Sequence, residues 1–196
     1  MIGIVDYEAG NIASVTNGLR AIGAQFIVSS DPTALRTCDG IILPGVGSAP
    51  GAMSALRRRG LDSFLVQNSR PLLGICLGMQ LLYESSEEGK TACLGLLTGS
   101  VRKFDASKQK VPHMGWNEVR RTKEVTLLNG IRDAEYFYFA HSYFAGVDSS
   151  VVAVSVVSHE FAAVVANGNC YGTQFHPEKS GDAGLKLLRN FEDLCK

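Results

Sequence analysis

The sequence of 196 residues lacks the features that would indicate a membrane, a nucleic acid or a secretory pathway. No apolar run approaches the roughly 18 residues of a membrane-spanning helix. Lys plus Arg and Asp plus Glu number 19 each, so no excess positive charge favours nucleic acid or an anionic lipid surface. Residues 1–6 carry no basic segment and predict a core strand, not a signal peptide. We expect a cytoplasmic protein with neither a nucleic-acid nor a membrane partner.

Cysteine is scarce and widely spaced. The five cysteines form no Cys-x-x-Cys pair, and their odd number argues against a disulfide framework and against structural zinc. A zinc deaminase, which His-x-Glu at residues 176–178 could suggest, would also need a Pro-Cys-x-x-Cys segment that is missing. We therefore expect no metal, and we expect four of the cysteines to be small apolar fillers. Only Cys76 has a sequence context that indicates chemistry.

The first half of the chain alternates between strand and helix patterns. Strands are predicted at residues 2–5, 25–28, 41–43 and 71–75, with helices at 12–22, near 32, at 53–67 (divided at Gly60) and at 77–83. This alternation predicts an α/β fold with a mostly parallel sheet between helices. The second half predicts β-rich, partly antiparallel additions at 111–120, 136–144, 151–157, 161–166 and 170–175, and a final helix at 182–194. Without a repeat or linker, we expect one domain, 1–196.

Cys76 lies in a Gly-x-Cys-x-Gly segment at the end of an apolar run. This pattern is typical of the nucleophile elbow, a sharp strand-to-helix turn that projects a reactive atom. Side chains larger than glycine at Gly74 and Gly78 would collide with the neighbouring strand or helix. The N-terminus of the following helix carries partial positive charge that favours a thiolate. The Leu77 N–H is then available to an oxyanion.

A second strand end carries the glycine-rich segment Pro44-Gly45-Val46-Gly47. It follows a buried strand and leaves backbone N–H groups without partners. These donors, from Gly47 above all, could complete an oxyanion hole beside Cys76. By itself the segment is equally compatible with an ordinary strand-to-helix turn.

His176-Pro177-Glu178 could supply the base for Cys76. Proline disfavours helix at the preceding residue, so His176 is expected to be extended. In an extended segment residues 176 and 178 point to the same side. Glu178 could then accept a hydrogen bond from one ring nitrogen of His176 and leave the other nitrogen for the thiol.

Together these residues carry a family resemblance that covers essentially the whole chain. Gly-Ile-Cys-Leu-Gly-Met-Gln at 74–80 and Gln-Phe-His-Pro-Glu at 174–178 resemble the class I, triad-type glutamine amidotransferases. Segments 6–11, 44–47, 112–117, 139–143 and 176–180 are similar to the glutaminase subunits of imidazole glycerol phosphate synthase, from histidine biosynthesis. Anthranilate-type and carbamoyl-phosphate-type relatives usually carry His where this chain has Met79.

The resemblance implies a flavodoxin-like fold without a cofactor, in which Cys76, His176 and Glu178 hydrolyse glutamine through a thioester. The oxyanion hole maps to Leu77 and to the loop at Val46 and Gly47. Glutamine-binding positions map to Gln80, Glu88, Ser142 and Tyr143. Apart from the resemblance, Glu88 would be taken as a solvated helix end.

The resemblance also implies a partner. The chain ends soon after the glutaminase residues, so we expect the ammonia acceptor to be a separate subunit. In the family this subunit is a (β/α)8-barrel cyclase, which forms a heterodimer and produces imidazole glycerol phosphate and aminoimidazole carboxamide ribotide. Positions that resemble its interface are Tyr136, Tyr138, His141 and Lys179. The single tryptophan, Trp116, is as compatible with the core as with a surface.

Three alternatives stay open from the residues. The chain could be the glutaminase of another amidotransferase, such as an anthranilate-type enzyme, although Met79 and segment 112–116 count against it. It could be a stand-alone hydrolase or peptidase with the same Cys-His-Glu set. It could also be a binding module that kept the fold, which the presence of all three triad residues disfavours.

Overall fold

The computed structural model describes residues 1–8 and 11–196, so residues 9 and 10 of the segment 6–11 lie outside the described residues. Nine of the described strands form one sheet, in the order β2-β1-β3-β4-β13-β12-β11-β8-β9. Their bounds are β1 Ile2–Val5, β2 Phe26–Ser29, β3 Gly40–Leu43, β4 Leu72–Ile75, β8 His113–Arg121, β9 Glu135–His141, β11 Val151–Val156, β12 Glu160–Asn167 and β13 Cys170–Thr173.

The pairing of the strands changes from parallel to antiparallel at β13. Strands from β2 to β13 pair in parallel, whereas β13, β12, β11, β8 and β9 pair antiparallel in that order. The predicted parallel sheet with antiparallel additions is therefore confirmed. A second sheet has the order β10-β7-β5-β6, with the bounds β10 Tyr143–Ala145, β7 Leu97–Lys103, β5 Tyr83–Ser86 and β6 Thr91–Ala92.

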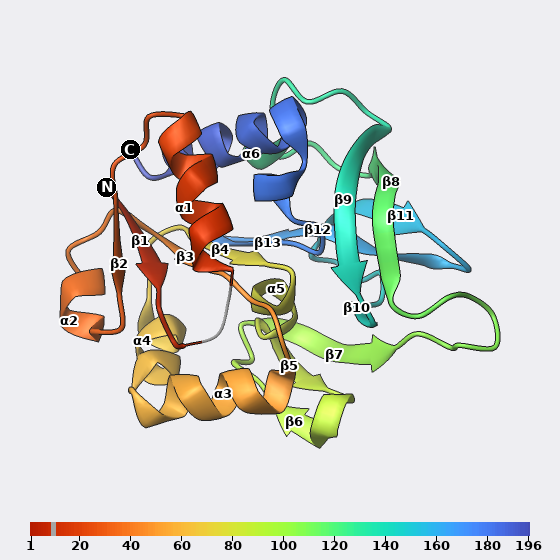
Figure 1. Cartoon of the computed structure of the whole chain (residues 1–196), viewed down its shortest axis with the longest axis horizontal. Helices are drawn as coiled ribbons and strands as arrows, with labels where there is room; N and C mark the ends of the chain where they lie inside the picture. Colours follow the sequence, from red (N-terminus) through yellow and green to blue (C-terminus); the bar gives the residue numbers. More distant parts are fainter. Residues whose placement is uncertain (9–10) are drawn as a thin grey trace.

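Helices cover both faces of the parallel part (Figure 1). The α-helices are α1 Ile12–Ala21, α2 Pro32–Leu35, α3 Ala49–Arg58, α4 Leu61–Gln67, α5 Leu77–Gln80 and α6 Gly181–Leu194, and the 3-10 turns are η1 Glu88–Lys90, η2 Thr126–Leu128 and η3 Pro177–Lys179. Asn11 caps α1, because its Oδ1 accepts a hydrogen bond of 3.4 Å from the Ser14 N–H. Asp31 caps α2 in the same way, with 2.8 Å to the Thr33 N–H.

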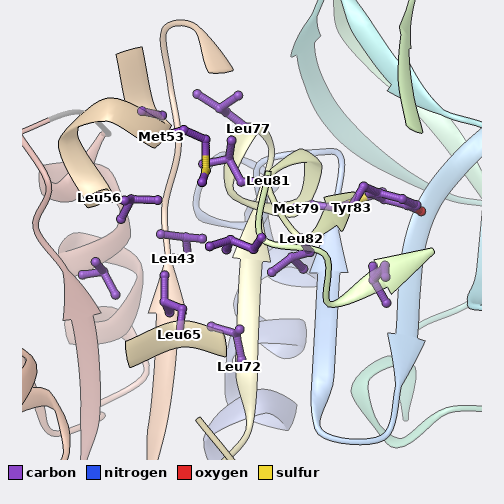
Figure 2. Packing of buried hydrophobic residues seen from close by; sticks show 14 of the residues in the cluster. Leu43, Met53, Leu56, Leu65, Leu72, Leu77, Met79, Leu81, Leu82 and Tyr83 are labelled. Atoms are coloured by element: carbon purple, nitrogen blue, oxygen red, sulfur yellow. The ribbon is translucent and has the colours of Figure 1, made fainter. Parts of the chain in front are cut away.

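Two apolar clusters hold the layers together. One contains α3 and α4 side chains, such as Met53, Leu56 and Leu65, packed against Leu43 and Leu72 of the sheet (Figure 2). The other contains side chains of α1 and α6 on the opposite face. Within residues 1–8 and 11–196, no helix combines the length and apolar character that a membrane crossing requires.

Several element predictions were wrong in their bounds. Helix α5 ends at Gln80 instead of continuing to Tyr83, and β5, β6 and β7 follow where no strand was predicted. Residues 81–83 are buried on all sides, so their apolar run carries no helical or strand period. Helix α3 begins at Ala49, before the predicted start at Met53. The predicted strand 136–144 is divided at Ser142 between the two sheets.

The topology brings three chain segments to one edge of the sheet. Strands β3, β4 and β13 are neighbours and run parallel, so their carboxyl ends lie together. The chain leaves β3 into residues 44–47, leaves β4 into Cys76 and leaves β13 toward His176. This edge is the usual ligand position in an open α/β sheet.

Candidate active site

Cys76 lies at a strained turn between β4 and α5. Its φ and ψ angles are 55° and −110°, outside the ordinary region for a residue with a side chain. A 2.7 Å hydrogen bond from the Cys76 N–H to the Thr173 carbonyl attaches the turn to β13. Since strain of this kind persists only where the surroundings impose it, the geometry agrees with the predicted nucleophile elbow.

The flanking glycines permit this turn. A Cβ atom at Gly78 would lie 1.9 Å from the Leu43 carbonyl oxygen. A Cβ atom at Gly74 would lie 2.7 Å from the Gly78 carbonyl carbon. Both distances are far below van der Waals contact, so any side chain would push β3, β4 and α5 apart. The predicted reason for glycine at these positions is confirmed.

His176 and Glu178 form a buried pair beside the thiol. His176 Nδ1 lies 2.9 Å from Glu178 Oε1, and their side chains are 4% and 0% exposed. Since a carboxylate can only accept, Nδ1 donates and Nε2 is left for Cys76. The backbone of His176 is extended, as predicted, but Glu178 lies in the 3-10 turn η3, so the two side chains meet through a turn and not along an extended segment. Pro177 at the first position of η3 favours this turn.

The surroundings of His176 favour its charged form. Burial by itself opposes the charge, but hydrogen bonds to Cys76 and Glu178 and the negative charge on both partners raise the pKa of His176 from 6.5 to about 10. Charged His176 beside a thiolate is the form in which the sulfur is nucleophilic and the proton is ready for a leaving group.

The predicted oxyanion and glutamine-binding residues surround one cavity with Cys76. The cavity has a volume of about 320 Å³. The predicted residues that line it are Val46, Gly47, Cys76, Leu77, Gln80, Glu88, His141, Ser142, Tyr143, His176 and Lys179. Leu77 is the first residue of α5, so its N–H has no preceding helical carbonyl as a partner. Gly47 has a φ of 98°, a conformation that favours glycine.

Gln80 is oriented by two acceptors. Its Nε2 donates to the Tyr143 carbonyl at 2.8 Å and to Gln174 Oε1 at 3.0 Å. Both N–H bonds are therefore used within the protein. The Gln80 side-chain oxygen is the atom left for a molecule in the cavity.

Glu88 does not end a helix, contrary to the interpretation made without the resemblance. It lies in η1, between β5 and β6, and is half-buried. Its Oε2 accepts a 2.7 Å hydrogen bond from the Ala49 N–H in the first turn of α3. That helix end favours a negative charge and fixes the carboxylate at the cavity.

The predicted interface residues divide into exposed and buried ones. Tyr136 is 50% exposed, and Lys179 Nζ lies 5.9 Å from the ring centroid of Tyr138 at the same surface. His141 is only 5% exposed and lies at the cavity wall, so its ring is not part of the exposed surface of the chain. The strand alternation explains this, because odd positions of β9 face inward. Trp116 is 56% exposed and belongs to the surface.

Gln174 also belongs to the site, although it was not among the predicted site residues. This residue is fully buried, and its Nε2 lies 3.9 Å from Cys76 Sγ, where it can donate to the sulfur. Gln174 lies in the Gln-Phe-His segment, but the residues next to it in the sequence do not predict its contacts with Cys76 and Gln80. His113, which pairs with His141, was missed for the same reason.

Within residues 1–8 and 11–196, no group of three or more His, Cys, Asp or Glu side chains could hold a metal ion. The groups at the cavity are the thiol of Cys76, the imidazole of His176 with its Glu178 carboxylate, and backbone N–H groups.

Comparisons with known proteins show similarity over nearly the whole chain. The family model "Glutamine amidotransferase class-I" matches residues 3–194. A Bacillus cereus protein described as "Imidazole glycerol phosphate synthase subunit HisH" is 50% identical over 201 aligned positions, which cover 100% of this chain and 96% of the relative.

Solved structures show the same fold at low identity. A structure described as a glutamine amidotransferase has a TM-score of 0.78 at 18% identity and covers 99% of this chain and 98% of its own. PurLQS from Thermotoga maritima has a TM-score of 0.73 at 21% identity, over 100% of this chain and 98% of the matched chain.

Proposed function

The chain belongs to the class-I glutamine amidotransferases, and we propose that it is the glutaminase subunit of an imidazole glycerol phosphate synthase. The observation that carries the glutaminase activity is the strained Cys76 elbow beside the His176–Glu178 pair in one cavity. The choice of synthase rests on the relative that is 50% identical over the whole chain.

In the first step we propose that the Cys76 thiolate attacks the side-chain carboxamide carbon of glutamine. A C–S bond forms, and the carbonyl electron pair moves to oxygen. The Leu77 N–H and the backbone at Val46 and Gly47 line the cavity where this oxyanion would lie. His176 then gives its Nε2 proton to the leaving nitrogen, the C–N bond breaks, and ammonia departs from a γ-glutamyl thioester.

In the second step water hydrolyses the thioester. His176, now neutral, accepts a proton from water as the oxygen attacks the acyl carbon. The C–S bond breaks, and glutamate and the Cys76 thiolate are released. Glu178, hydrogen-bonded to Nδ1, keeps the ring orientation through both steps.

The cavity offers a carboxylate and an amide oxygen to a positively charged group of the substrate. We propose that Glu88 and the Gln80 oxygen bind the α-ammonium end of glutamine, with the backbone of Ser142 and Tyr143 alongside. Glu88 is suited to this role because its carboxylate is fixed by the Ala49 N–H.

We propose that the ammonia passes to a (β/α)8-barrel cyclase in a heterodimer. Free ammonia would be protonated in neutral water and would lose its nucleophilicity, so direct transfer is expected. The surface with Tyr136, Tyr138 and Lys179 lies next to the cavity and is the proposed docking site. A cytoplasmic location agrees with five cysteines that are unpaired in the described residues.

Replacement of the nucleophile tests this function. In the complex with the cyclase, Cys76→Ala is expected to abolish glutamine-dependent synthesis of imidazole glycerol phosphate and to retain ammonia-dependent synthesis. Cys93→Ala, a half-buried cysteine away from the cavity, serves as the matched control and is expected to retain both reactions. Loss of the ammonia reaction in Cys76→Ala would show that Cys76 does something other than release ammonia.

The isolated chain is expected to hydrolyse glutamine weakly. An oxyanion donor at Val46 or Gly47 that must reorient would cost about 10²–10³ in rate for each donor out of place. Glutaminase turnover is measured with and without the cyclase and its nucleotide ligand. Equal turnover in both cases would favour a stand-alone hydrolase.

A further inference from the structure

Two histidines that the reaction does not use are paired next to the glutamine cavity. His113 and His141 lie directly opposite each other on β8 and β9. His113 Nδ1 is 2.9 Å from His141 Nε2, and His141 Nδ1 is 2.8 Å from the Tyr143 carbonyl oxygen. The pair therefore connects the β8–β9 ribbon to the wall of the cavity.

The Tyr143 carbonyl determines which atom donates in each of these hydrogen bonds. A carbonyl can only accept, so His141 Nδ1 carries the proton that it donates to Tyr143. If His141 is neutral, its Nε2 is an acceptor, and His113 Nδ1 must be the donor. His113 Nε2 then accepts from Asn117 Nδ2 at 3.5 Å, and the same amide also donates to the Val156 carbonyl at 2.9 Å.

The environment keeps both rings neutral. Burial, with smaller contributions from the charges of His113 and His176, lowers the pKa of His141 to about 3, although the hydrogen bond to Tyr143 acts in the opposite direction. Burial also lowers the pKa of His113. A neutral ring has one donor nitrogen and one acceptor nitrogen. The two hydrogen bonds, from His113 to His141 and from His141 to the Tyr143 carbonyl, therefore have the same direction, and we call this chain the relay.

Aromatic packing fixes the ring planes. The Phe104 ring centroid lies 5.2 Å from that of His141, and the Phe139 centroid lies 5.1 Å from that of His113. Rings held in this way cannot turn to exchange Nδ1 for Nε2 without disturbing the cluster.

The relay ends at the Tyr143 carbonyl, which also accepts a hydrogen bond from Gln80. The Tyr143 carbonyl accepts from His141 Nδ1 and from Gln80 Nε2, each at 2.8 Å. A carbonyl oxygen has two lone pairs, so both are used. If the peptide at Tyr143 turned, Gln80 would lose one of its two acceptors and could present its nitrogen instead of its oxygen to the cavity.

We propose that His113 and His141 are positioning residues: they form a one-way hydrogen-bond relay that holds the Tyr143 carbonyl and thereby presents the Gln80 oxygen to glutamine. This inference rests on the proposed function, because it assumes that glutamine is the substrate bound in this cavity. It adds a requirement for glutamine binding that lies outside the triad and the oxyanion loop.

The test compares two substitutions of His113 in the complex with the cyclase. His113→Asn places an amide nitrogen near the position of Nδ1 and retains the donor, whereas His113→Leu removes it. His113→Leu is expected to raise KM for glutamine about tenfold, the effect of one misplaced buried hydrogen bond, with kcat within about twofold. His113→Asn is expected to restore most of this loss.

A matched control lies in the same aromatic cluster. His159 is exposed and lies edge-on to Phe144, with ring centroids 4.7 Å apart, but it makes no hydrogen bond to His141. His159→Leu is expected to leave KM unchanged. An equal rise in KM for His113→Leu and His159→Leu, or no rescue by His113→Asn, would assign His113 to packing and overturn the proposal.

The protonated nitrogens can be measured in the unmodified chain. Nitrogen-15 NMR at pH 7 is expected to show His113 and His141 as neutral rings protonated at Nδ1. A proton on Nε2 of His141, or a doubly protonated ring, would overturn the relay even if the variants fail to fold. The wild-type complex separates the two hypotheses: absence of glutaminase activity there would contradict the proposed function, whereas activity with unchanged KM in His113→Leu would contradict only the relay.

Discussion

At the scale of single residues, the charge on His176 depends on two partners. Hydrogen bonds to Cys76 and Glu178, and the negative charge of the Cys76 thiolate and the Glu178 carboxylate, raise its pKa to about 10 against the effect of burial. The raised pKa means that protonated His176 stabilises the fold: this contribution is complete below pH 6.5, the ordinary pKa, and is lost as the pH rises through about 10.

Glu178→Gln is expected to lower the pKa of His176 toward 6.5, because the variant removes a negative charge and a charge-assisted hydrogen bond. The pKa is measured by NMR titration of the His176 ring. In the same variant, the decrease of the free energy of unfolding between pH 6.5 and 10 should become smaller.

Glu118→Gln, at an exposed position of β8, provides the control and is expected to leave the titration of His176 unchanged. A titration midpoint that stays near 10 in Glu178→Gln would mean that the carboxylate does not set the charge of the ring.

At the scale of secondary-structure elements, the close approach of α5 to β3 decides where Cys76 points. Gly78 lies against the Leu43 carbonyl, and Gly45 lies against α5, where a Cβ atom would be 2.4 Å from the Gly78 nitrogen. The elbow therefore depends on three strands and a four-residue helix that touch through backbone atoms. Packing of this kind leaves no room for even one methyl group.

Gly78→Ala is expected to reduce the free energy of unfolding by about 3 kcal/mol, because the methyl group must separate α5 from β3. Gly51→Ala is the matched control in an exposed turn of α3, where the new Cβ atom would meet only Ser48 Oγ at 3.2 Å. There the better helix propensity of alanine should give no loss or a gain of about 0.5–1 kcal/mol. Urea unfolding measures both, and equal effects would contradict the packing argument.

A second contact between elements involves α6. The buried side chain of Asn190 donates to the carbonyls of Leu127 and Asn129 at 3.0 and 2.8 Å and so attaches η2 to α6. Asn190→Leu is expected to cost about 1–3 kcal/mol, since two carbonyls lose a buried donor. Chemical denaturation checks this value, with the exposed Asn17→Leu of α1 as control. Equal stability of the two variants would show that water replaces the lost donor.

At the scale of the whole molecule, the β8–β9 ribbon has two different faces. Its inner face carries His113, Phe137 and His141, and its outer face exposes aromatic and apolar side chains next to the cavity. The exposed fractions are 63% for Met114, 56% for Trp116 and 50% for Tyr136. A surface of this composition favours protein association.

Tyr136→Ala is expected to weaken binding of the cyclase about tenfold or more without changing the free energy of unfolding, because the side chain is exposed in the isolated chain. Calorimetric titration measures the affinity. Val66→Ala, 51% exposed on α4, is the control and should bind as wild type. Unchanged affinity in Tyr136→Ala would place the docking site elsewhere.

Features that depend on neighbouring residues follow directly from the amino-acid sequence. The cap at Asn11, the turn through Cys76 and the alternation of strands with helices are set by steric and hydrogen-bonding rules that act over a few positions. The catalytic roles of Cys76, His176 and Glu178 could be predicted for the same reason, because their motifs are short. The β5–β7 strands were not, because their residues pair only with distant segments and carry no clear period of their own.

Contacts between side chains that are distant in the sequence depend on the complete fold. Gln174 reaches Cys76 across 98 positions, and Glu88 reaches the Ala49 N–H across 39. His141 faces the cavity and not the exposed outer surface because strand register, set by the pairing with His113, determines which side of the ribbon it occupies. Such contacts follow from the order of strands in the sheet, and the packing that selects this order involves the whole chain at once.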